Sequence, residues 1–245
     1  MWNPSDPSFL LAIVAVALLY SMVGHGGASG YLALMSFTLL AGRPASTLAL
    51  VMNLGVAGIS FLSYQRARHF DWGLAWPFLA GSIPCAFVGG RIHVPGEYHK
   101  WLISLSLVCA AAWLLWGLRQ PEKEAKPCPL WLSILSGAVL GLVSGMIGIG
   151  GGIFLSPLLI LTGWANAKTA SSTAAVFILL NSLAGLAARS ADDLLVVPEH
   201  SSLIAAAVAA SVVGSLFGAF RATSPQLKTA LGVVLAMAAV KLATG

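Results

Sequence analysis

Two glycine-rich runs carry the residues best suited to hold a ligand. The first reads GHGGASG at 24–30 and the second reads GMIGIGGGIF at 145–154, and apolar sequence flanks both. Each glycine costs a helix about 1 kcal/mol relative to alanine, so we expect the helices to break here. Backbone N–H groups that converge at a break, near the positive end of the next helix, form an anion site. The glycines proposed to line it are Gly24, Gly26, Gly27, Gly30, Gly148, Gly150, Gly151 and Gly152.

A second interpretation is that these glycines only let helices pack closely, as small residues do in membranes. Hydroxyl and amide side chains in and after both runs favour a binding role. Hydroxyls would complete the hydrogen-bond shell of an anion, or they would cap the long helices that follow. An amide in apolar sequence needs a partner, which is either the ligand or a neighbouring helix. The candidates are Ser29, Ser46, Thr47, Asn53, Ser171, Ser172, Thr173 and Asn181.

His25 lies between two glycines and is the sharpest single candidate. Histidine exchanges a proton near physiological pH, and an ionisable group in so apolar a segment is a functional hypothesis by default. We therefore predict that His25 contacts the ligand and carries a coupling proton. The other possibility is a neutral imidazole hydrogen-bonded to the backbone. The remaining histidines lie in predicted loops, at 69, 93, 99 and 200.

The composition places the whole chain in lipid. Hydrophobic residues make up 58% of the 245 residues, only 9% are charged, and the mean hydropathy is +0.88. A soluble domain carries about 25% charged residues, so this chain cannot solvate a globular surface. The net charge is +5, and the basic residues lie in short gaps between apolar runs. That placement predicts membrane topology signals and lipid contacts, not nucleic-acid binding.

Apolar segments define the elements that must position the glycines. They fall at roughly 8–24, 30–42, 46–63, 74–92 and 100–118, and then at 130–147, 153–163, 168–188, 201–220 and 226–243. Several reach the ~20 residues that cross a bilayer. The segments at 30–42 and 153–163 are too short for this, which predicts half-helices, tilted helices or parts of re-entrant hairpins.

The two halves of the chain resemble each other. GHGGASGYLALM at 24–35 parallels GIGGGIFLSPLL at 148–159, and the stretch 46–58 parallels 171–185. We therefore predict a first transmembrane repeat at 1–118, a charged connector at 119–129 and a second repeat at 130–245. With five crossings each and the N-terminus outside, basic residues concentrate inside, which favours inverted copies. A parallel arrangement gives no such bias.

Enzyme signatures are absent from the sequence. No nucleophile elbow, phosphate-binding loop or cluster of metal ligands occurs, and the three cysteines are isolated. We expect no catalytic residues, no cofactor and no metal. Without an ATP-binding motif, uphill transport would draw on a proton or another ion gradient.

The GMIGIGGGIFLSPLL run, followed by ASSTAAVFILLNSLAGL and a weaker first-half copy of both, resembles the TauE/SafE family of membrane permeases. The resemblance covers nearly the whole chain and implies transport, usually export, of sulfite, a sulfonate or a related sulfur-containing anion. One difference is that His25 stands where the second copy has Ile149.

These observations predict an all-α polytopic protein of the bacterial inner membrane with its N-terminus in the periplasm. It would have about eight to ten membrane segments in two repeats, with broken or short helices at the glycines. The expected mechanism is alternating access in a secondary transporter, with the repeats rocking about a shared site. A passive anion channel lined by the same glycines is the alternative.

Overall fold

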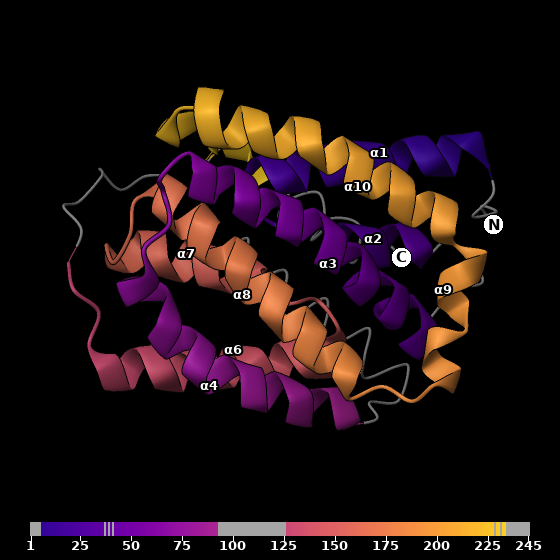
Figure 1. The fold of residues 1–245 in the computed structure, drawn as a ribbon, viewed down its shortest axis with the longest axis horizontal. Coiled ribbons are helices and arrows are strands. Elements are labelled where there is room, and N and C mark those ends of the chain that lie inside the picture. The colour runs from indigo at the N-terminus through magenta and orange to yellow at the C-terminus, as the bar shows by residue number, and fades with distance from the viewer. Residues whose placement is uncertain are drawn as a thin grey trace.

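The computed structural model describes residues 6–92 and 126–233, apart from 37, 39, 41, 228 and 231. Within these residues the chain is helical and contains no strand, which confirms the all-α prediction (Figure 1). The predicted segment at 100–118 and most of that at 226–243 lie outside the described residues, as do His93 and His99. The elements are α1 (Pro7–Met22), α2 (Ala28–Met35), α3 (Arg43–Arg66), α4 (Trp72–Arg91), α6 (Leu130–Ile147), α7 (Gly152–Thr162), α8 (Ala167–Ala187), η1 (Asp192–Leu194), α9 (Val196–Glu199), α10 (Ser201–Leu216) and η2 (Phe217–Arg221).

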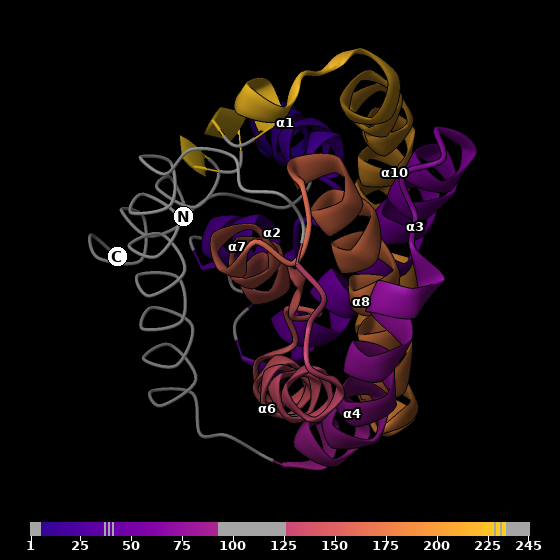
Figure 2. The ribbon, with the colours of Figure 1, turned by 90° about the vertical axis from the view of Figure 1, so that its left-hand side faces the viewer.

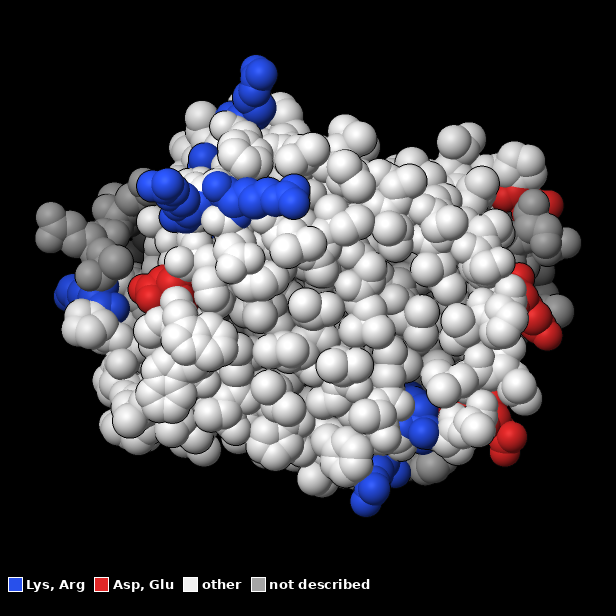
Figure 3. Space-filling model, in the orientation of Figure 1, with Lys and Arg blue, Asp and Glu red and all other residues white. Residues whose placement is uncertain are grey.

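Five helical stretches of the described chain are long and apolar enough to cross a membrane: α3, α4, α6, α8 and the continuous helix Ser201–Arg221. The apolar helices α1 and α7 are shorter. On the face that Figure 3 shows, charged side chains lie toward the two ends of the molecule and leave an uncharged band between them. This band is what the apolar core of a bilayer requires, because a charge placed there is costly.

The long helices form two groups that run in opposite directions. Contacts between C-terminal residues show that α1, α3 and α10 are parallel: the hydroxyl of Tyr64 donates to the carbonyl of Met22, and Ser63 bonds to Ser215. Contacts of Gly90 with Gly185 likewise show that α4 and α8 are parallel. The start of α3 lies beside the end of α8, so these two helices are antiparallel, as Figure 1 shows.

Each half of the chain packs a helix onto the other half. From the first half, α4 packs against α6 and α8, and from the second half, α10 packs against α1 and α3. Helices at matching positions, such as α1 and α6, run in opposite directions (Figure 1). This is the arrangement that an inverted repeat requires; the duplication itself stays a prediction.

Glycines bring α4 and α6 into backbone contact. A β-carbon added at Gly81, Gly137, Gly141 or Gly145 would collide with a backbone oxygen of the other helix. Small residues at such positions replace the hydrophobic drive that lipid does not supply. The packing interpretation of glycine therefore holds for this interface, which lies outside the two predicted runs except at Gly145.

We expect Gly137→Leu to prevent α4 from packing on α6, because a β-carbon there meets the backbone oxygen of Phe78. Overpacking of this kind typically costs about 1–3 kcal/mol or more. Thermal unfolding in detergent would measure the loss. Val139→Leu is the matched control, since Val139 lies on the same helix and is 54% exposed. Equal unfolding temperatures for the two variants would contradict this packing.

Candidate functional site

Two half-helices begin near the centre of the molecule and extend away from each other. α2 and α7 have 8 and 11 residues and are therefore about 12 and 16 Å long. They lie on opposite sides of the middle in Figure 1 and overlap in the end view of Figure 2, so they are nearly in line. Gly27 and Gly151 precede them with φ of +94° and +77°, a conformation that glycine adopts without strain. The glycine runs thus break the helices, as predicted.

The N-termini of both half-helices leave amide hydrogens unused. No acceptor in the described part of the chain receives the N–H groups of Gly26, Gly27, Gly150 or Gly151. All four glycines are buried. Buried backbone donors are normally paired, so a set of unpaired ones at two helix starts marks a place for a bound acceptor. The dipoles of α2 and α7 make this place favourable for an anion.

Asn53 ties the two glycine runs together. Its amide oxygen accepts from the backbone N–H of Ala28 at 3.2 Å, and its amide nitrogen donates to the carbonyl of Ile149 at 3.2 Å. A second donor contact reaches the hydroxyl of Ser182 at 3.3 Å. The sequence left either a ligand or a neighbouring helix as the partner of this amide. In the structure its partners are neighbouring parts of the protein. Its role toward a ligand stays a prediction.

His25 bridges the same two runs. Its Nδ1 lies 2.9 Å from the carbonyl of Val23, and its Nε2 lies 3.0 Å from the carbonyl of Gly152 at the start of α7. The side chain is 2% exposed. A neutral imidazole has one N–H and can donate to only one of these carbonyls, whereas the protonated ring donates to both. The geometry thus fits a neutral ring that donates to one carbonyl and a protonated ring that donates to both.

Each glycine run packs on the long helix of the opposite half. A β-carbon at Gly24 would meet the backbone of Ser171, and one at Gly148 would lie 2.7 Å from the β-carbon of Ser46.

The capping prediction for the hydroxyls is wrong, because Gly42 and Asn166 are the N-caps of α3 and α8. The helices begin three or more residues earlier than that prediction required. Inside the first turn, Ser46 and Thr47 donate to the carbonyl of Arg43.

Several buried polar side chains of the second half have no hydrogen-bond partner among the described residues. Asn181 is 1% exposed, and neither atom of its amide has a partner in the part of the chain that the structure describes. The same is true of the hydroxyls of Ser172, Thr173 and Ser144. In the first half, Ser29 bonds to the hydroxyl of Tyr20, whereas the hydroxyls of Tyr31 and Ser82 have no partner among the described residues. An unpaired buried polar group is costly, so the unpaired side chains of the second half favour a ligand on the α8 side.

Ser144 was not predicted from the sequence. It lies in α6, one turn before Gly148, and its side chain is within 3.3 Å of a β-carbon placed at Gly151. A serine among apolar residues is typical of close helix packing, so its type alone does not indicate a binding role. The only sequence signal was its position one helical turn before the glycine run.

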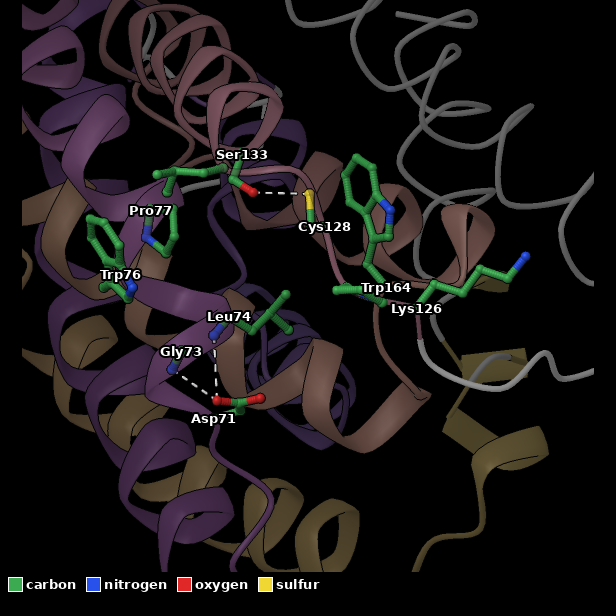
Figure 4. Close-up of a pocket in the computed structure, with 11 residues that line it drawn as sticks. Asp71, Gly73, Leu74, Trp76, Pro77, Lys126, Cys128, Ser133 and Trp164 are labelled. Atoms are coloured by element: carbon green, nitrogen blue, oxygen red, sulfur yellow. Dashed lines mark hydrogen bonds between the residues drawn. The ribbon is translucent and has the colours of Figure 1, made fainter.

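The cavity shown in Figure 4 lies elsewhere, at the N-terminal ends of α4 and α6. Its volume is about 390 Å³, and none of the predicted site residues lines it. The carboxylate of Asp71 accepts hydrogen bonds from the N–H groups of Gly73 and Leu74, and the hydroxyl of Ser133 donates to the sulfur of Cys128. Trp164 completes the wall. Asp71, Ser133 and Cys128 therefore already have partners within the protein, so the cavity is a weaker ligand site than the glycine runs.

The described residues contain no cluster of His, Cys, Asp or Glu that would hold a metal ion. The chemistry that the site offers is thus hydrogen bonding by amides and hydroxyls, with one imidazole beside them.

Comparison with known proteins gives a consistent result. Residues 9–242 match the family described as "Sulfite exporter TauE/SafE". The chain is 31% identical over 239 residues to the "Probable membrane transporter protein y4hK" of Sinorhizobium fredii, covering 95% of this chain and 96% of that protein. No solved structure matches the chain.

Proposed function

Because the chain belongs to the TauE/SafE family of membrane transporters, we propose that it moves a small sulfur-containing anion through the site between α2 and α7. Sulfite or a sulfonate fits the chemistry, since both are compact and offer several acceptor oxygens to amide and hydroxyl donors. The observation that carries this proposal is a set of buried N–H groups at two helix N-termini that have no acceptor among the described residues. Broken helices that point positive ends at an anionic group are a recurring design in transporters.

The ligand would lie between the glycine runs and α8. The amides of Gly26, Gly27, Gly150 and Gly151 would supply its first hydrogen bonds. The unpaired side chains of Ser172, Thr173 and Asn181 would complete the shell. Asn53 would hold the two runs in register, and this is a positioning role.

Alternating access would follow from rocking one parallel helix group against the other. α3 of one group packs on α8 of the other, so this pair forms the contact between the two groups. Asn53 lies on α3, and the unpaired hydroxyls of Ser172 and Thr173 lie on α8. The two domains proposed from the sequence, 1–118 and 130–245, exchange α4 and α10. The moving bodies would therefore be α1, α3 and α10 on one side and α4, α6 and α8 on the other.

The charges at the two ends favour an inner-membrane orientation with the N-terminus in the periplasm. Arg66, Arg68, Lys168 and Arg221 lie at the end where α3 and α10 terminate, and Lys168 contacts the carbonyl of Ala219 there. The opposite end carries acidic residues around η1 and α9. Positive residues face the cytoplasm in such proteins, so the first end would be cytoplasmic.

Flux of sulfite into proteoliposomes would test the proposal. We expect uptake that saturates with sulfite concentration and accumulates against its gradient when a proton gradient is imposed. A passive channel, the second candidate function, would equilibrate sulfite and never accumulate it. Vesicles with the purified chain that move no sulfite, sulfonate or thiosulfate above protein-free vesicles would disprove anion transport of this class.

A further inference from the structure

A charged cluster at the periplasm-facing end adjoins the glycine site. Arg189 follows the end of α8 and donates from its guanidinium to the hydroxyl of Ser46 at 2.9 Å. Ser46 is itself in contact distance of Gly148, with 2.7 Å between its β-carbon and a β-carbon placed on the glycine. Arg189 thus stands one side chain away from the second glycine run.

The carboxylate nearest this arginine is already used. Asp193 forms an ion pair with Arg43 at 2.9 Å, and both side chains are largely buried, at 15% and 21% exposed. Asp193 also accepts from the backbone N–H and the hydroxyl of Ser190. Arg43 in turn contacts the carbonyl of Gly90. Asp193 therefore lies near both arginines, but its ion pair is with Arg43.

Arg189 is left with a positive charge that no carboxylate of the described chain pairs with. Its Nε is buried and has no hydrogen-bond partner among the described residues. Burial, together with the neighbouring charge of Arg43, lowers the pKa of Arg189 to about 10, so it still carries its proton at neutral pH. A half-buried charge without a carboxylate partner is unfavourable, and an incoming anion would pair with it.

We propose that Arg189, positioned by Ser46, forms a docking site for the transported oxyanion at the periplasmic mouth of the glycine site. The inference rests on the proposed transport of a sulfur-containing anion. A guanidinium presents a planar fork of N–H donors that matches two oxygens of a sulfite or sulfonate group. The hydroxyl of Ser46 accepts from Arg189, and Ser46 packs on Gly148, so Ser46 places the guanidinium beside the amides that follow this glycine. Because Asp193 neutralises Arg43, the mouth keeps one free positive charge and favours a singly charged anion.

Kinetics of Arg189→Gln from each side of the membrane would test this assignment. In oriented vesicles, we expect KM for sulfite presented at the periplasmic face to rise about tenfold to a hundredfold, the usual loss for hydrogen bonds to a charged group. KM at the cytoplasmic face and the maximal rate would change little. Arg189→Lys keeps the charge without the fork, so it would restore part of the affinity.

Arg91→Gln is the matched control, because Arg91 lies at the same end, is exposed and stacks over the ring of Phe87 at 4.5 Å. It should leave KM at both faces unchanged. Three results would overturn the docking site: an unchanged KM for Arg189→Gln, an equal rise in KM at both faces, or an equal rise in the Arg91→Gln control. Flux by the wild type would still support the proposed transport in each case. If Arg189→Gln does not fold, Arg189→Lys carries the test: wild-type KM at the periplasmic face would overturn the fork. Wild-type vesicles without flux would instead refute the proposed function.

Discussion

Gly150→Ala is expected to stop anion flux while leaving the helices of the chain in the membrane. Gly150 has a φ of +79°, and the left-handed conformation costs a residue with a side chain about 1–2 kcal/mol. Its new β-carbon would lie 2.8 Å from the amide nitrogen of Asn53 and 2.8 Å from a methyl carbon of Ile178. Relief of that contact moves Asn53 away from the carbonyl of Ile149. The amides of the second run then no longer face the ligand, and sulfite flux in proteoliposomes would report the loss.

Leucine at Gly150 or Gly151 should have the same effect more strongly, since Gly151 is also left-handed and is crowded by Phe177. Gly58→Ala is the matched control. Gly58 lies within α3, and the nearest atom to its added β-carbon is 3.8 Å away. This variant should show normal flux and slightly higher thermal stability, since alanine gains about 1 kcal/mol over glycine in a helix. Normal flux in Gly150→Ala would count against the glycine site.

The positions of the helices could be predicted from the sequence, because apolar runs and glycine breaks are local signals. The prediction for 130–147 coincides with α6, and that for 168–188 differs from α8 by one residue at each end. The capping prediction for Ser46 and the serines at 171 and 172 failed because Pro44 and Asn166 start the helices earlier. A proline in the first turn and an asparagine cap were visible in the sequence and outweigh the later hydroxyls.

The contacts that build the site could not be predicted in this way. Asn53 reaches Ile149 and Ser182, which lie 96 and 129 positions away along the chain. Hydropathy shows that a helix enters the membrane, but in lipid it does not show which helix it will contact. The sequence therefore could not predict that α4 packs on the second half and α10 on the first. For the same reason the sequence does not single out Arg189, which contacts Ser46 beside the glycine run.

The second large effect concerns coupling. His25→Gln is expected to keep sulfite flux down its own gradient and to abolish accumulation driven by a proton gradient. Glutamine can donate one hydrogen bond to the carbonyl of Gly152, as a neutral imidazole would, but it cannot take up a proton. The protonated ring holds both carbonyls, of Val23 and Gly152, and so locks α7 to the first run; deprotonation frees one of these links.

Proton binding at His25 would thus decide whether the two glycine runs move together. The measurement is sulfite accumulation in proteoliposomes with and without an imposed pH difference, alongside flux at equal pH. His69→Gln is the control, since His69 lies in the loop after α3, away from both glycine runs, and contacts the carbonyl of Ala219. That variant should accumulate sulfite as the wild type does. Undiminished proton-driven accumulation in His25→Gln would assign the coupling to another group and leave His25 as a hydrogen-bonded bridge between the runs.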